Sequence, residues 1–65
     1  MFQGFNTFYS DAETCTLLVK RQSDGVVFQA YHDGEAWVGD RVNIIEEEDG
    51  EYMEPSDPQE TITLA

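Results

Sequence analysis

The chain has 65 residues, of which 14 are Asp or Glu and only 3 are Lys or Arg, so its formal net charge is −11 at pH 7. A chain of this length forms one domain, expected to span residues 1–65 with an acidic C-terminal segment over 42–65. Three basic residues cannot make the positive surface that nucleic-acid phosphates or an anionic membrane require. We therefore expect neither direct nucleic-acid binding nor membrane binding.

The composition is that of a folded domain, with 40 % hydrophobic and 12 % aromatic residues. A domain of about 60 residues buries only roughly 60 % of the surface of its unfolded chain, so its stability is marginal. Cys15 has no second cysteine for a disulfide, and Cys15 and His32 alone do not make a zinc site. We expect no cofactor and no metal, and either a well-packed small sheet or a homodimer that completes the core.

The start of the chain has no basic region, and no apolar run reaches ten residues. Neither a signal peptide nor a transmembrane span is therefore expected, and the predicted location is the cytoplasm.

The first segment, Phe2–Tyr9, carries four aromatic residues at spacings that fit neither a helix nor a strand. We interpret it as the first strand. Ser10–Glu13 has the form of a helix capping box, but between two strands it more simply predicts a turn.

Three Asp-Gly pairs follow, and such a pair between strand-like runs predicts a two-residue hairpin turn. The runs beside them are rich in β-branched and aromatic residues, as strands are. The predicted strands cover 14–21, 26–32 and 36–46, and the predicted turns are Asp24-Gly25, Asp33-Gly34 and Asp49-Gly50.

These turns set a testable register, because successive side chains of a strand point to opposite faces. Two-residue loops place Val19 opposite Ala30, Ala30 opposite Trp37, and His32 opposite Glu35. One face then gathers the apolar residues Leu17, Val19, Val26, Phe28, Ala30 and Trp37. The opposite face is more mixed.

Beyond the third turn, Tyr52 and Met53 start a return strand, proline-containing irregular structure follows, and 61–64 forms a last edge strand. The fold class is therefore all-β: a small antiparallel meander of four to six strands, either an SH3-like small barrel or a curved open sheet. Gly39 predicts a bulge or bend, with Arg41 available to an acidic neighbour.

Catalytic chemistry is not expected. Cys15 and His32 are the one Cys/His combination, and we interpret them as a buried thiol and a histidine at a hairpin end. The acidic run at 46–51 lacks the spacing of a calcium-binding loop, and its side chains should diverge to opposite faces of a strand. The chain is thus predicted not to be an enzyme.

The acidic residues are unevenly distributed. Eight of the 14 lie between positions 46 and 60, and no Lys or Arg follows Arg41. Side chains at i and i+2 of a strand are about 6.6–6.8 Å apart, twice the roughly 3.4 Å rise per phosphate of one DNA strand. Carboxylates on a hairpin could therefore imitate a phosphate track.

The predicted function is that of a small inhibitor or adaptor that docks on a basic, nucleic-acid-binding groove of another protein. In size and charge the chain is similar to small acidic phage proteins that inhibit host nucleic-acid enzymes as DNA mimics in anti-defence, which would place it in the host cytoplasm. The predicted partner-binding residues are Glu46, Glu47, Glu48, Asp49, Glu51, Tyr52, Met53 and Glu54. The alternative is a structural or assembly module that pairs strand edges or homodimerises, in which Phe2, Phe5, Phe8 and Ile62 would matter more.

Overall fold

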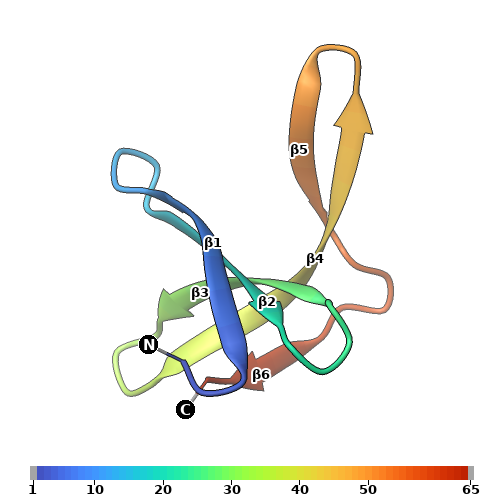
Figure 1. The fold of residues 1–65 in the computed structure, drawn as a ribbon. Helices are drawn as coiled ribbons and strands as arrows, with labels where there is room; N and C mark the ends of the chain where they lie inside the picture. Colours follow the sequence, from blue (N-terminus) through green and yellow to red (C-terminus); the bar gives the residue numbers. More distant parts are fainter. Residues whose placement is uncertain (1, 65) are drawn as a thin grey trace.

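The computed structural model describes residues 2–64, which form one antiparallel sheet of six strands (Figure 1). The strands are β1 (Phe5–Asp11), β2 (Thr16–Arg21), β3 (Val27–His32), β4 (Trp37–Glu47), β5 (Gly50–Pro55) and β6 (Thr61–Thr63). Neighbours follow chain order from β1 to β5, and β6 pairs with β4. The predicted meander is confirmed, and of its two forms the sheet is the open one, since β1 pairs with β2 alone.

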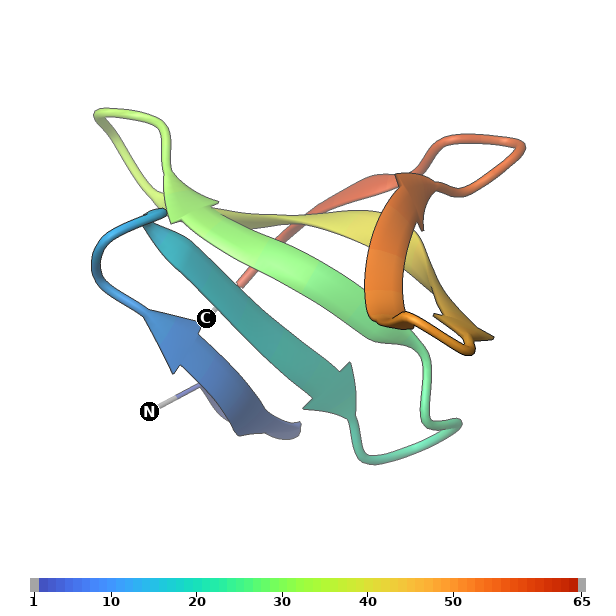
Figure 2. The same ribbon diagram turned by 90° about the horizontal axis from the view of Figure 1, so that it is seen from above.

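Strand β4 belongs to two parts of the molecule. Its first half, residues 37–41, pairs with β3, and β6 pairs with the same half. Its second half, residues 42–47, pairs with β5 alone. The β4–β5 hairpin consequently rises away from the other strands (Figure 1), and the view from above shows the twist of the remaining sheet (Figure 2).

The hydrophobic core covers one face of the sheet. Val19 and Phe28 are fully buried and lie directly opposite each other on β2 and β3. The other buried core residues are Phe2, Ala30 and Leu64, with Phe5, Leu17, Val26 and Ile62 half-buried against them. The predicted apolar face is therefore confirmed for its five members on β2 and β3 and in the loop between them. Trp37 stays 41 % exposed and packs edge-on against the Phe2 ring, with the ring centroids 5.5 Å apart.

The three hairpins form near the Asp-Gly pairs, but the predicted registers are wrong by two positions. Val19 pairs with Phe28 rather than Ala30, and Ala30 pairs with Gly39 rather than Trp37. Likewise His32 pairs with Trp37 and not with Glu35. A shift of two leaves every side chain on its predicted face, because the strand repeat is two residues.

Side chains in the loops account for the first two shifts. The guanidinium of Arg21 donates two hydrogen bonds to Asp24, of 3.0 and 2.7 Å, and Asp24 also accepts from the backbone N–H of Val26. These bonds hold a four-residue loop between Arg21 and Val26. In the second hairpin the Asp33 carboxylate accepts from the N–H groups of Glu35 and Ala36, so the turn is displaced by one residue.

A β-bulge explains the irregular aromatic spacing in the first strand. Thr7 pairs with Val19 and Tyr9 pairs with Leu18, so Phe8 is the extra residue. The bulge places Phe8 and Tyr9 on the same side of the sheet, away from the core. The predicted strand is present, but it begins at Phe5, and the turn predicted at Ser10–Glu13 follows it at residues 12–15.

Gly39 does not mark a bulge, since the pairing of β4 with β3 and with β6 runs through it without a shift. Its role is close packing: a Cβ atom at this position would lie 3.1 Å from the Cβ of Phe28 and 3.5 Å from a methyl group of Leu64. The acidic neighbour predicted for Arg41 is Glu60, at 3.9 Å.

Gly39→Ala should therefore destabilise the fold, because the fully buried Phe28 has no room to withdraw. We expect the free energy of unfolding to fall by about 1–3 kcal/mol, measured by urea denaturation. The control is Asn43→Ala, at an exposed position of the same strand. An equally small loss for both variants would contradict this role of Gly39.

Asp24 in the first loop should make the free energy of unfolding depend on pH. The hydrogen bonds from Arg21, and then that from Val26, lower the pKa of Asp24 from 3.8 to about 2. A carboxyl group with a depressed folded-state pKa stabilises the fold above its unfolded value and loses that contribution as the pH falls through the folded value. The stability difference between the wild type and Asp24→Asn should thus be constant above pH 5 and shrink steadily as the pH falls towards 2, in urea titrations at each pH. A difference as large at pH 2 as at pH 6 would contradict it.

Candidate binding site

The predicted partner-binding residues all lie on the β4–β5 hairpin. Glu46 and Glu47 end β4, and Glu51, Tyr52, Met53 and Glu54 belong to β5. The loop consists of Glu48 and Asp49, one residue earlier than predicted, because Gly50 pairs with Glu47. All six acidic side chains among them are exposed to solvent.

Strand alternation divides these carboxylates between two faces. Glu46 and Glu51 form a directly opposed pair on one face, whereas a two-residue turn at Asp49-Gly50 would place Glu48 opposite Glu51. Glu47 and Glu54 point to the other face, and the loop residues form the tip. Neither strand carries acidic residues at i and i+2, so the phosphate-like spacing does not occur within β4 or β5.

One carboxylate on the outer face is held by an aromatic residue. The hydroxyl of Tyr52 donates a hydrogen bond of 3.1 Å to Glu47. This bond, with partial desolvation, raises the pKa of Tyr52 above its usual value. The Tyr52 ring is 47 % exposed, so the outer face of the hairpin combines an aromatic surface with negative charge.

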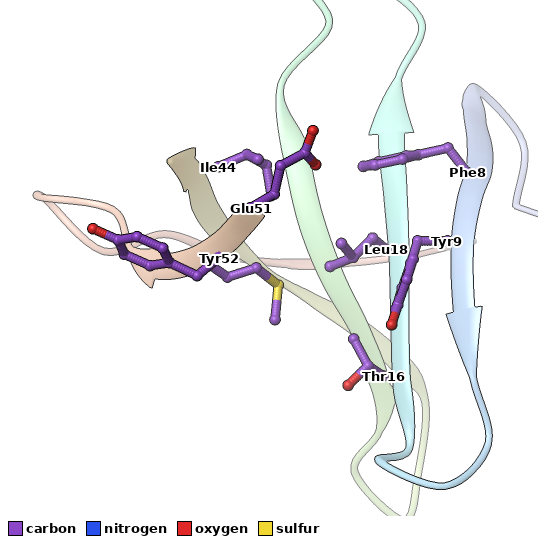
Figure 3. Close-up of a pocket in the computed structure, with 8 residues that line it drawn as sticks. Phe8, Tyr9, Thr16, Leu18, Ile44, Glu51 and Tyr52 are labelled. Atoms are coloured by element: carbon purple, nitrogen blue, oxygen red, sulfur yellow. The ribbon is translucent and has the colours of Figure 1, made fainter. Parts of the chain in front are cut away.

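An apolar groove that the sequence did not predict lies between the hairpin and strands β1 and β2, with a volume of about 380 Å³. Its apolar lining consists of Phe8, Tyr9, Leu18, Ile44, Tyr52 and Met53. Figure 3 shows Phe8, Tyr9 and Leu18 on the β1–β2 side and Ile44 with Glu51 approaching from the hairpin. Tyr52 borders the groove, but its ring points away from it (Figure 3). Of the two apolar residues among the predicted partner-binding residues, Met53 thus lies on the groove face of β5 and Tyr52 on the outer face.

A signal for this groove exists in the sequence. Apolar residues occur as adjacent pairs at Phe8-Tyr9, Leu17-Leu18 and Ile44-Ile45. In a strand, adjacent side chains point to opposite faces, so an adjacent apolar pair supplies both faces. Leu17 joins the core face, whereas Leu18 is buried on the groove side and is only 6 % exposed. The bulge at Phe8, which turns both aromatic residues of the first pair to the groove side, has no comparable signal.

A second hollow, of about 430 Å³, brings Cys15 and His32 to one surface together with Asp11 and Trp37. Cys15 is exposed, so its predicted burial is wrong, while His32 does end its strand as predicted. The Cys15 Sγ lies 3.7 Å from the carbonyl oxygen of Ala12, and His32 Nδ1 accepts a hydrogen bond from the N–H of Gly34. Both groups are therefore engaged within their own turns rather than with each other.

Among residues 2–64, no three His, Cys, Asp or Glu side chains come together in a way that could hold a metal ion. The described part of the chain also has no helix long and apolar enough to cross a membrane.

Comparison of the chain with protein-family models, with curated proteins and with solved structures gives no match.

The opposed pair on the groove face of the hairpin makes a stability prediction. Like charges directly opposite each other across two strands are destabilising. Glu46→Lys should replace repulsion from Glu51 by attraction and raise the free energy of unfolding by up to about 1 kcal/mol at low salt. The control is Glu35→Lys, which changes the net charge equally in the exposed β3–β4 loop. If urea denaturation gives the same gain for both, the effect belongs to net charge and not to the pair.

Proposed function

We propose that this chain is a non-enzymatic binding protein that inserts its β4–β5 hairpin into a basic groove of a partner protein. A groove that normally binds nucleic acid is the partner surface of the right sign, and occupation of it would inhibit the partner. The observation that supports this most directly is the concentration of negative charge on a hairpin that stands clear of the core (Figure 1).

The paired part of the hairpin and its loop, residues 42–55, contain no Lys or Arg. The basic residues of the chain are Lys20, Arg21 and Arg41. Arg21 pairs with Asp24, and Arg41 lies beside Glu60. The net negative potential of the hairpin is therefore available to a partner, and it would accelerate association with a basic surface.

The shape of the hairpin favours a concave partner. Carboxylates point from its two faces and from its tip, so a flat basic surface could contact only part of them at once. A groove with basic side chains on both walls could contact all of them. Wrapping of this kind, rather than a ladder of carboxylates at phosphate spacing, is the form of mimicry that the β4–β5 register supports.

The test is charge reversal in the hairpin. The Glu47→Lys/Glu48→Lys variant should lose the proteins that the wild type captures at low salt from a lysate of the host cell in which the chain is made. The matched control, Glu13→Lys/Glu35→Lys, makes the same change in net charge at exposed positions outside the hairpin and should retain them. Captured proteins, identified by mass spectrometry, should include a nucleic-acid-binding protein that is released at high salt.

Two results would contradict the proposal. Equal capture by the hairpin variant and the wild type would show that the acidic hairpin is not the binding surface. Salt-resistant self-association in light scattering would instead favour the assembly module, which pairs strand edges.

The assembly alternative has less support from the positions of its residues. Phe2 is buried in the core, and Phe5 and Ile62 pack against it. Phe8 alone of the four is exposed, and it lies in the bulge of β1. A bulge on an edge strand discourages pairing with a further strand.

A further inference from the structure

The groove beside the hairpin is unusual for a domain with so small a core. Phe8 and Tyr9 are 49 % and 47 % exposed at its edge, although burying them would stabilise the fold. Exposed apolar surface gathered around a hollow marks interaction sites in soluble proteins. The groove volume of about 380 Å³ lies in the range of ligand-binding pockets, roughly 300–1,000 Å³.

The charge around the groove specifies the sign of its occupant. Glu51 lines the groove, and Glu46 lies directly opposite Glu51 on the same face of the hairpin. Across the groove, Lys20 places one positive charge beside Phe8, with its ammonium nitrogen 5.2 Å from the ring centroid, so the anionic side of the groove is the hairpin wall. An apolar floor with acidic residues on the hairpin side is complementary to an apolar side chain whose neighbouring Lys or Arg residues face the hairpin.

We propose that the groove binds an apolar anchor residue of the same basic partner, flanked in its sequence by Lys or Arg. The anchor lies between Leu18 and Met53, and the flanking cations face Glu51 and Glu46. This inference rests on the proposed function, because the hairpin supplies one wall of the groove. The groove would add a specific contact to the proposed function. Electrostatic attraction would speed association with the partner, and the anchor residue would fix the orientation of the complex.

Three synthetic peptides test the proposal. The first has one Trp between Gly residues with two Lys at each end. The second has Ser in place of Trp, and the third has Glu in place of every Lys. The Trp–Lys peptide should bind about tenfold more tightly than the Ser–Lys peptide, since partial burial of one aromatic side chain is worth at least that factor. The Trp–Glu peptide should bind more weakly than either.

Variants locate the anchor. Met53→Ser should remove the tenfold advantage of Trp over Ser and leave the affinity of the Ser–Lys peptide unchanged. Tyr9→Ser, at a half-exposed position on the opposite wall, should do the same if Met53→Ser fails to fold. The matched control is Tyr31→Ser, an exposed aromatic residue at the second hollow, which should keep the advantage. Affinities are measured by NMR titration. The methyl signals of Leu18 and Ile44 should shift on addition of the Trp–Lys peptide and not on addition of the Ser–Lys peptide.

The outcomes separate this inference from the proposed function. Equal binding of the Trp–Lys and Ser–Lys peptides overturns the groove inference and leaves charge-driven docking intact. Tighter binding of the Trp–Glu peptide than of the Ser–Lys peptide overturns the cationic occupant and counts against the proposed function as well. A dimer that dissociates on Met53→Ser, seen by light scattering without peptide, would show that a second copy fills the groove and would overturn the inference.

Discussion

The packing of Phe28 and Leu64 over Gly39 is the constraint on which the rest of the molecule depends. Gly39 lies at the middle of the half of β4 that pairs with β3 and β6, and a Cβ atom there would press on Phe28 at 3.1 Å. Phe28 is fully buried, and Leu64 closes the same face of the sheet from the other end of the chain. The core cluster of the described residues contains five buried apolar residues, so few other contacts could compensate for the loss of this packing.

Only one half of β4 is anchored in the core, and the other half is free to extend beyond it. An eleven-residue strand is longer than its partners, so its C-terminal half extends beyond the core and pairs with β5 alone. That half carries Glu46, which lies directly opposite Glu51 of β5, and the repulsion within this pair costs stability in a part of the molecule outside the core. The same extension forms the groove, because the hairpin then provides one wall and the bulged strand β1, with β2, provides the other. Charge and apolar surface thus become adjacent through one long strand.

Local signals predicted much of this arrangement and failed in a consistent way. The Asp-Gly pairs located all three hairpins, and the two-residue repeat placed Val19, Phe28 and Ala30 on one face. The registers of the first two hairpins were wrong by two positions because the side chains of Asp24 and Asp33 accept hydrogen bonds from the loop backbone and reshape the turns. Hydrophobic patterning cannot detect a register shift of two residues, because each side chain stays on the same face of the sheet.

The sequence by itself determined the all-β class, the order of the strands along the chain and the gathering of acidic residues at positions 46–60, because turn chemistry, alternation and charge are local properties. Only the tertiary structure decided that β6 pairs with β4, that Phe2 and Leu64 close the core, and that Leu18 meets Met53 across a groove. Those contacts join residues far apart in the chain. They depend on the bulge at Phe8 and on the twist that carries the hairpin away from the sheet, and neither can be read from local spacing.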